Sequence, residues 1–344
     1  MIYCVRKIEP PETFKAEYPV TEELQSARKN AVSQIRNILS GKDKRKLFVV
    51  GPCSADDPDA VCDYAVKLAR IAKKAEDRLF VIVRAHTAKP RTRSDEYMGL
   101  IHTPDVKDCA VTDIAGGLCA MRKLHVRILR ESGLPTADEL LYPEILPYID
   151  DCVSYLFVGA RTCDDPLHRF AASGAEVPVG IKNPLNGNIE DLFYSVLSAK
   201  SRNEFFYRGE QARSSGNEYA HAVLRGYVDA DGRHVGNYGK ECVMRYKTLC
   251  ENCGADCSLL IDAGHSNSGK NALKQCDTIA AALDCMRDKA YADAVKGFIV
   301  ESYIEGGVGV PGKSKYGQSV TDECLDFGRT ERLILSVAEK LTAS

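Results

Sequence analysis

The chain has 344 residues, of which 44% are hydrophobic and 27% charged, enough to bury a large core in one big domain or two ordinary ones. Lys and Arg number 46 and Asp and Glu 48, so a net charge of −2 excludes a general positive field for nucleic acid or an anionic membrane. No apolar run approaches the roughly 20 residues of a membrane span, and the amino terminus lacks the apolar stretch of a signal peptide. Because the 14 cysteines are scattered along a long chain, we interpret them as reduced thiols and expect a soluble, cytoplasmic protein.

The first 45 residues differ in character from the rest. They begin with an extended, Pro-bearing stretch, after which Thr21 is a candidate N-cap with Glu22 and Glu23 in the first helical turn. Gly41 marks the end of that helix. We expect residues 1–45 to be an arm plus a helix that makes oligomer contacts or serves regulation, and residues 46–344 to be a catalytic domain.

A βα pattern recurs from about residue 45 onwards: a short apolar run, a polar turn, then a longer stretch with helical spacing. The predicted strands are 47–53, 79–84, 138–142, 155–161, 177–182, 221–226, 258–265 and 297–303. Near-continuous apolar strands are typical of a parallel sheet covered on both faces, and eight βα units indicate a (β/α)8 TIM barrel of the α/β class. A doubly wound sheet is the alternative. Helices are predicted over 57–75 and 112–129, and a hairpin over 226–240.

Polar residues stand at or near the ends of these runs, where a TIM barrel carries its chemistry. They are Cys53, Arg84, Glu139, Arg161, Lys182, Arg225, His265 and Glu301, of which Glu139 opens its run. Four are cations, and burying four like charges is prohibitive unless an anion or acidic partners compensate them. The sequence therefore predicts an anionic ligand; the alternative is that these cations only pair with acids at the rim.

A metal site is predicted from the other strand ends. Cys53, His265 and Glu301, with Asp322 shortly after, offer a thiolate, an imidazole and carboxylates, a mixed set that suits Mn, Fe, Co or Zn. Taken singly, such a Cys or His is more often an ordinary core residue. In the stiff turn 89–92, Arg91 and Thr92 suit a phosphate, although a surface charge pair is the simpler interpretation.

Three other motifs are interpreted as look-alikes. Residues 307–314 match the phosphate-loop pattern, but no helix is predicted to open there, as such a loop requires. Cys250, Cys253 and Cys257 have metal-ligand spacing, but they look like cysteines at a helix end. Residues 229–232 resemble the start of a calcium loop without its distal Glu, so we expect a turn.

Several segments together resemble one family. They are VVGPCS (49–54), KPRT (89–92), VGART (158–162), PVGIKN (178–183), GHSNS (264–268) and YGQSVTD (316–322). In these segments the chain resembles the type I 3-deoxy-D-arabino-heptulosonate 7-phosphate (DAHP) synthases, the first enzymes of the shikimate pathway. The resemblance implies a metal-dependent, aldol-type condensation of phosphoenolpyruvate with erythrose 4-phosphate and water, giving DAHP and phosphate, by a homo-oligomer.

The resemblance also implies roles for individual residues. The implied metal ligands are Cys53, His265, Glu301 and Asp322. The implied phosphoenolpyruvate-binding residues are Arg84, Lys89, Arg161, Lys182 and Arg225, with Glu139 also in the substrate site. Arg91 and Thr92 would face the phosphate of erythrose 4-phosphate, and Lys89 or metal-bound water would carry the proton.

Some positions depart from the family pattern. Met98 stands where the family has Lys, in a loop one residue longer, and the 226–240 excursion is additional. In the cavity where relatives bind a feedback aromatic amino acid, Pro147 fits the pattern, but Tyr148 and Glu176 do not. The inhibitor is therefore left unassigned. A paralogue that uses another aldose, and an inactive barrel that senses amino acids, are the alternative functions.

Overall fold

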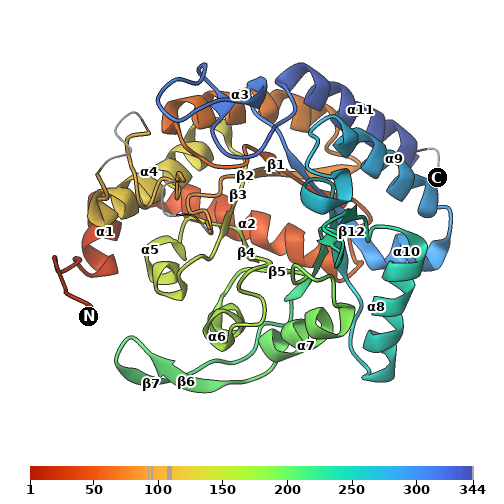
Figure 1. Cartoon of the computed structure of the whole chain (residues 1–344), viewed down its shortest axis with the longest axis horizontal. Coiled ribbons are helices and arrows are strands. Elements are labelled where there is room, and N and C mark those ends of the chain that lie inside the picture. Colours follow the sequence, from red (N-terminus) through yellow and green to blue (C-terminus); the bar gives the residue numbers. More distant parts are fainter. Residues whose placement is uncertain (92, 94–95, 107–110, 343–344) are drawn as a thin grey trace.

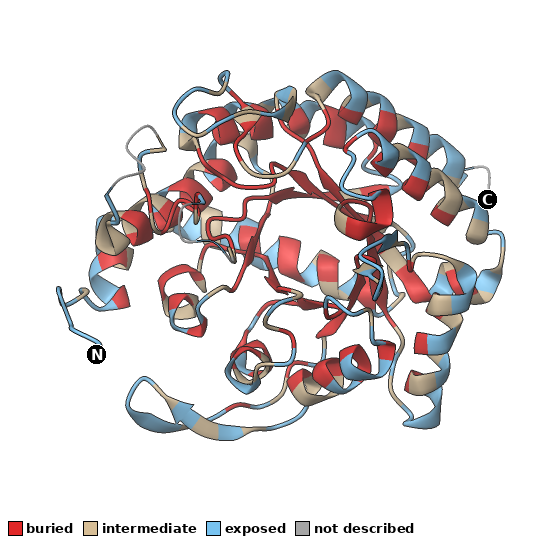
Figure 2. Cartoon of the chain, in the orientation of Figure 1, coloured by how far each residue is buried: buried red, intermediate tan, exposed pale blue. Residues whose placement is uncertain are grey.

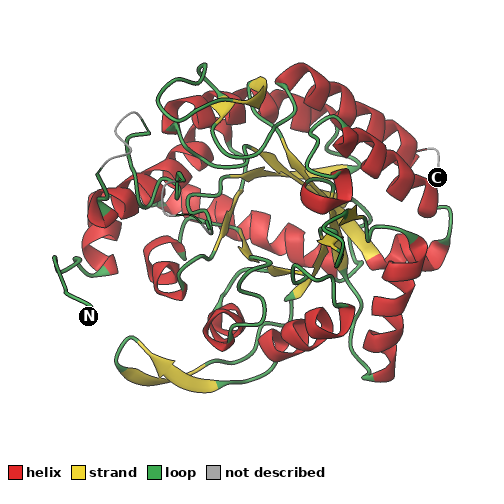
Figure 3. Ribbon diagram, in the orientation of Figure 1, coloured by secondary structure: helices red, strands yellow, loops and turns green. Residues whose placement is uncertain are grey.

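Eight parallel strands form a closed barrel in the computed structural model, which describes residues 1–91, 93, 96–106 and 111–342 (Figures 1 and 3). The strands are β1 (Lys46–Gly51), β2 (Leu79–Arg84), β3 (Thr136–Glu139), β4 (Tyr155–Val158), β5 (Val179–Lys182), β8 (His221–Leu224), β11 (Leu259–Asp262) and β12 (Val295–Glu301). They neighbour one another in this order, and β12 pairs with β1 to close the sheet. The TIM-barrel prediction is therefore confirmed, and the doubly wound alternative is wrong.

The strand boundaries differ from the prediction mainly at the ends. Most strands stop two or three residues early, because the chain turns into the loops that carry the polar residues. The third strand is displaced as a whole: it begins at Thr136 instead of residue 138, so Glu139 ends the strand. The side chain of Glu139 thus belongs at the same barrel mouth as the other strand-end residues.

Helices surround the barrel, and their buried faces turn towards it (Figure 2). The two predicted helices are present as α3 (Pro58–Lys74), which Asp57 caps, and α4 (Ile114–Ser132), which Asp113 caps. The remaining helices of this layer are α5 (Leu146–Ile149), α6 (Pro166–Gly174), α7 (Ile189–Lys200), α8 (Lys240–Asn252), α9 (Lys274–Cys285), α10 (Lys289–Ala294) and α11 (Phe327–Thr342). Among the described residues, no helix combines the length and apolarity needed to cross a membrane.

The amino-terminal extension contributes to the barrel core. Helix α2 (Glu22–Leu39) begins after Thr21, whose side chain accepts a hydrogen bond from the Leu24 amide, as the sequence predicted. It lies across the barrel in Figure 1, and Ile35 and Ile38 pack with side chains of the barrel interior. The start of the chain was predicted as extended, but it contains helix α1 (Pro11–Glu17), because Pro11 opens a turn whose Phe14 is buried.

Three short hairpins or ladders lie outside the barrel. The predicted excursion after β8 is confirmed as the pair β9 (Tyr227–Val228) and β10 (His234–Val235). The hairpin of β6 (Glu204–Tyr207) and β7 (Glu210–Arg213) was not predicted, although the positive φ angles at its turn, Arg208 and Gly209, fit the rule for two-residue hairpins. The pair β13 (Glu305–Val308) and β14 (Gln318–Ser319) completes the set.

The look-alike motifs behave as the sequence suggested. A turn, and not a helix, follows β13 within residues 307–314, so no phosphate loop forms there. Cys253 lies at the carboxyl end of α8, and the cysteines around it form no metal-ligand group within the described ranges. Residues 229–232 form a turn closed by a hydrogen bond from the Gly232 amide to the Asp229 carbonyl.

The free energy of unfolding should depend on pH through His221, which is buried inside the barrel. Its Nε2 lies 2.5 Å from the Tyr155 hydroxyl and its Nδ1 2.8 Å from the Tyr219 carbonyl, a pattern that suits a neutral ring. Burial lowers the pKa of His221 to about 4. Because the unfolded chain binds this proton near pH 6.5, stability should fall as the pH drops from 6.5 towards 4, by roughly 1.4 kcal/mol per pH unit.

Denaturant titrations of the wild type and of His221→Gln at pH 7 and pH 4.5 measure this contribution. The variant is expected to lose about 2 to 3 kcal/mol less than the wild type over that interval. An identical pH dependence in the two proteins would show that His221 does not supply it.

Candidate active site

Three predicted metal ligands converge at one end of the barrel. Cys53 follows β1, Glu301 ends β12, and Asp322 follows β14; one ligand atom from each lies within 4.8 Å of the other two. The parallel register of β1 and β12 sets Gly51 beside Glu301. Gly51 must lack a side chain, since a Cβ there would stand 2.1 Å from the Arg84 carbonyl oxygen. The close packing of these strands therefore places Cys53 next to Glu301.

Cations surround Cys53. The Lys89 Nζ lies 3.2 Å from the Cys53 sulfur and 2.8 Å from its carbonyl oxygen, and Arg84 donates to that same oxygen at 2.8 Å. Arg84 also pairs with Glu301 at 2.9 Å, and both side chains are buried. Burial, followed by Glu301, raises the pKa of the Cys53 thiol, so the protein alone favours the protonated form. A bound cation would reverse this preference.

His265 lies beside the cluster. Its Nε2 is 3.9 Å from the Glu301 Oε1, and its Nδ1 is 2.9 Å from the carboxylate of the buried Asp262. Its φ of 53° lies in the left-handed region, which is unusual for a non-glycine residue and is common at functional sites. A carboxylate behind a ring nitrogen is the arrangement that orients metal-binding histidines.

The donor set fits a borderline divalent ion. A thiol, two carboxylates and a neighbouring imidazole are ligands that such ions share, whereas Mg²⁺ and Ca²⁺ prefer oxygen alone. Burial raises the pKa of Asp322, but Lys89, His265, Lys270 and Arg91 outweigh it and hold the value at about 2. Asp322 is therefore ionised at neutral pH and ready to bind a cation.

A cavity of about 120 Å³ opens next to this cluster. Seven cationic side chains and two carboxylates line it, an excess that suits anionic ligands. The cations are Arg84, Lys89, Arg91, Arg161, Lys182, Arg225 and Lys270. The four strand-end cations therefore do converge, as predicted.

Two of these cations also pair with buried acids, in line with the alternative that the strand-end cations are balanced by acids of the protein itself. The Lys182 Nζ lies 2.5 Å from Glu139, and Arg84 contacts Glu301. Burial raises the pKa of Glu139, but Lys182 and Lys89 outweigh it and lower the value to about 2. For the cation Arg225, burial has the opposite effect and lowers the pKa. Pairing within the protein is thus part of the charge balance, but the cavity still has a surplus of positive charge.

The loop after β2 carries the remaining predicted residues. Arg91 reaches the cavity, and its Nε lies 3.4 Å from the Tyr97 carbonyl. Thr92 lies outside the described residues. Lys270 was not predicted, because only strand ends were considered; the available signal was a Lys two residues after GHSNS (264–268), and its φ is 60° in the structure.

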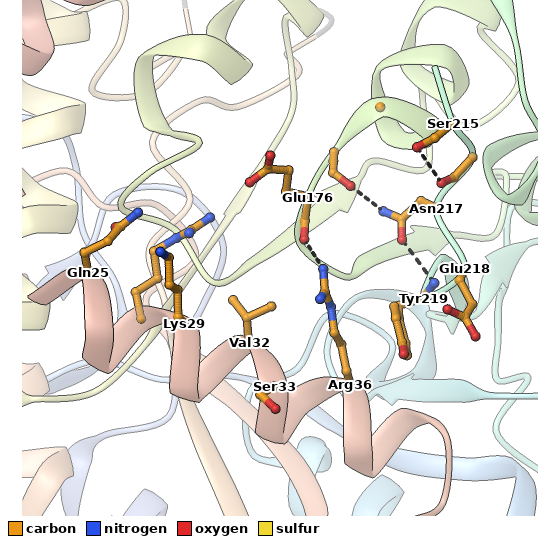
Figure 4. Close-up of a pocket in the computed structure, with 14 residues that line it drawn as sticks. Gln25, Lys29, Val32, Ser33, Arg36, Glu176, Ser215, Asn217, Glu218 and Tyr219 are labelled. Carbon is orange, nitrogen blue, oxygen red and sulfur yellow. Dashed lines mark hydrogen bonds between the residues drawn. The ribbon is translucent and has the colours of Figure 1, made fainter. Parts of the chain in front are cut away.

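A second cavity, of about 650 Å³, lies at the opposite end of the barrel (Figure 4). Residues of α2, including Arg36, face Glu176 and Tyr219, which precede β5 and β8. The Arg36 guanidinium lies 5.1 Å from the centre of the Tyr219 ring and donates to the Glu176 carbonyl at 2.5 Å. The metal-ligand group found among the described residues, Cys53, Glu301 and Asp322, lies at the other end, beside the cavity at the carboxyl ends of the strands.

A closed TIM barrel with this cation-lined cavity at the carboxyl ends of its strands defines the class as an enzyme for small anionic substrates. The comparisons make the class specific: the model of the DAHP synthetase I family matches residues 18–334. The chain therefore belongs to the DAHP synthetase I family, and it is a DAHP synthase of aromatic amino acid biosynthesis.

Individual relatives agree over nearly the whole chain. The Phe-sensitive phospho-2-dehydro-3-deoxyheptonate aldolase of Escherichia coli K12 is 32% identical over 98% of this chain and 96% of its own length. The Trp-sensitive enzyme of Enterobacter agglomerans is 33% identical over 96% of this chain and 94% of its own. The solved structure of the Francisella tularensis SCHU S4 enzyme superposes with a TM-score of 0.91 at 30% identity, covering 99% of both chains.

Proposed function

We propose that this enzyme condenses phosphoenolpyruvate with erythrose 4-phosphate and water, giving DAHP and phosphate, at the cation-lined cavity beside Cys53. The observation that carries the proposal is the surplus of cations around a cluster of metal-ligand atoms. Two phosphates and one carboxylate repel one another, so aligning them needs preorganised Arg and Lys side chains. The cavity supplies these side chains from several strands at once.

In the proposed site, Cys53, Glu301, Asp322 and His265 hold one divalent ion: Mn, Fe, Co or Zn. When bound, such an ion supplies Lewis acidity that polarises the aldehyde of the acceptor. The donor chemistry of the four residues supports this assignment, and the Asp262 carboxylate, 2.9 Å from the His265 Nδ1, stands where it can orient the ring.

The other residues bind and orient the two substrates. Arg84, Lys89, Arg161, Lys182 and Arg225 hold phosphoenolpyruvate, and Glu139 fixes Lys182. Arg91 binds the phosphate of the aldehyde; the family resemblance implies the same role for Thr92, which lies outside the described residues. Carbon 3 of the enol forms a bond to the aldehyde carbon, whose oxygen gains a proton. Water adds to carbon 2, where cationic character develops, and loses a proton; the bond from carbon 2 to phosphate then breaks as the ketone forms. Lys89 carries the proton that this step needs, since its Nζ lies 3.2 Å from the Cys53 sulfur of the ligand cluster.

An assay that couples phosphoenolpyruvate loss to phosphate release tests the proposal. Turnover is expected with erythrose 4-phosphate, and a chelator should abolish it until Mn²⁺, Fe²⁺, Co²⁺ or Zn²⁺ is restored. Turnover only with another aldose would mean that erythrose 4-phosphate is not the acceptor. Met98 and the β9–β10 hairpin are the departures from the family pattern that would fit such a result. Absence of turnover with every aldehyde would favour the amino-acid sensor instead.

Regulation and assembly belong to the same proposal. The E. coli and E. agglomerans relatives are named for sensitivity to Phe and Trp, and we infer that an aromatic amino acid also inhibits this enzyme. Phe14 of α1 packs edge-on against Tyr148, whose hydroxyl donates to the Glu9 carbonyl, so the amino-terminal arm reaches α5. This contact supports a division into an extension, 1–45, that serves regulation or oligomer contacts, and a catalytic barrel, 46–344.

The proposed assembly is a homo-oligomer, a dimer or tetramer, in the cytoplasm. The exposed apolar residues Met1, Ile2 and Val5 of the arm support a contact with another copy. All the cysteines that the structure describes are free, which suits a reducing compartment.

A further inference from the structure

A buried polar cluster lies between the barrel and α4, directly behind the active site. It contains Asp138 of β3, His125 of α4, and two threonines, Thr87 and Thr136; all four are at most 1% exposed. Asp138 and Glu139 are consecutive residues of a strand, so their side chains point to opposite faces. Glu139 lines the cavity, whereas Asp138 turns away from it and cannot touch a substrate.

The Asp138 carboxylate accepts four hydrogen bonds. Thr87 donates twice, from its amide to Oδ1 at 2.9 Å and from its hydroxyl to Oδ2 at 2.6 Å. The His125 Nε2 lies 3.0 Å from Oδ2, and the Glu139 amide donates to Oδ1 at 2.7 Å. The other nitrogen of His125 lies 3.0 Å from the Thr136 hydroxyl. A buried carboxylate without solvent contact needs such donors, and together they fix the position of the Asp138 carboxylate relative to Thr87 and Glu139.

Thr87 is the base of the loop that carries Lys89 and Arg91. The two legs of this loop are joined by a hydrogen bond from the Ile101 amide to the Thr87 carbonyl at 3.1 Å and one from the Lys89 amide to the Met98 carbonyl at 3.0 Å. Gly99 has a φ of 97°, and a Cβ there would stand 2.5 Å from the Thr87 carbonyl oxygen. The position of Thr87 therefore sets where the loop leaves the barrel.

We propose that Asp138 is a positioning residue of the active site: by holding Thr87 it fixes the loop with Lys89 and Arg91 relative to Glu139. This inference rests on the roles proposed above for Lys89 and Arg91. Phosphoenolpyruvate is held mainly by side chains from other strands, so loosening the loop acts chiefly on the aldehyde and on the chemical step. A misplacement of about 1 Å near reacting groups costs on the order of 100-fold in rate.

Thr87→Val tests this, because it removes only the hydroxyl donor, and Thr87→Ser is the rescue variant. In Thr87→Val and in Asp138→Asn, kcat is expected to fall about 10- to 100-fold and the KM for erythrose 4-phosphate to rise about tenfold. The KM for phosphoenolpyruvate should change less than about threefold. Thr87→Ser should restore kcat and the KM for erythrose 4-phosphate to near the wild-type values.

Thr136→Val is the matched control, since it removes a hydrogen bond of His125 on the side away from the loop. It is expected to lower the melting temperature without raising the KM for the aldehyde. The inference is overturned if Thr87→Val lowers the melting temperature but leaves both KM values unchanged, or if Thr136→Val raises the aldehyde KM equally. A wild type without turnover on erythrose 4-phosphate would contradict the proposed function, and not this inference.

Discussion

Replacing Cys53 by Ala is expected to remove both the bound metal and the turnover. Cys53 supplies the only sulfur of the proposed ligand set, and without its thiolate Glu301, Asp322 and His265 should hold a borderline ion much less tightly. Loss of Lewis-acid stabilisation is worth several kcal/mol, so kcat/KM should fall by about 1,000-fold or more. Metal content by elemental analysis and initial rates with saturating added metal measure the two effects.

Cys152→Ala is a suitable control for the cysteine variant. Cys152 is also buried and free, but its thiol donates to the Ile149 carbonyl, far from the ligand cluster in sequence and fold. This variant should keep its metal and its turnover. Full metal content and full activity in Cys53→Ala would show that the ion, if the reaction needs one, is bound elsewhere.

Replacing Lys182 by Met should weaken both the fold and substrate binding. The change leaves the buried Glu139 carboxylate without its closest partner, and breaking one side of a buried pair costs roughly 3 to 5 kcal/mol of stability. A lost charge-assisted contact to phosphoenolpyruvate should raise its dissociation constant by about 100-fold. Denaturant unfolding and calorimetric titration with phosphoenolpyruvate measure the two losses separately.

The double variant Lys182→Met with Glu139→Gln separates the two roles. Without the buried charge it should recover most of the stability, but phosphoenolpyruvate affinity should stay low. The stabilities of the wild type and of Lys182→Met should also converge in acid. The pKa of Glu139 is about 2 in the folded wild type, below its ordinary value of 4.5, so the Lys182–Glu139 pair stabilises the fold above pH 4.5 and loses this effect as the pH falls towards 2. Recovery of phosphoenolpyruvate binding in the double variant would contradict the proposed contact.

The barrel could be predicted from the sequence because each strand is a short apolar run, covered on both faces. Residues such as Cys53 and Glu301 then follow from a rule of the fold, that parallel strands end at one mouth. Glu139 was harder, since Thr136 and Ala137 carry little apolar signal, although they begin β3. The hairpin of β6 and β7 was missed because its strands are mostly exposed and lack a buried run.

The finer parts of the site depend on contacts that no local pattern encodes. Lys270 reaches the cavity from a loop, and its place there follows only from the packing of that loop on the barrel. The bonds of Asp138 to Thr87 and His125 join residues 51 and 13 positions away. Likewise, the pairing of Lys182 with Glu139 joins two strands whose side chains meet only once the barrel closes.

The proposed mechanism depends most on a single divalent ion held beside the cation-lined cavity. A crystal of the enzyme grown with Mn²⁺ and phosphoenolpyruvate, measured at an energy where manganese scatters anomalously, tests this directly. One strong peak is expected among Cys53, Glu301, Asp322 and His265, with the phosphate of phosphoenolpyruvate against Arg225 and Lys182. A peak at any other place, or phosphoenolpyruvate bound away from these side chains, would contradict it.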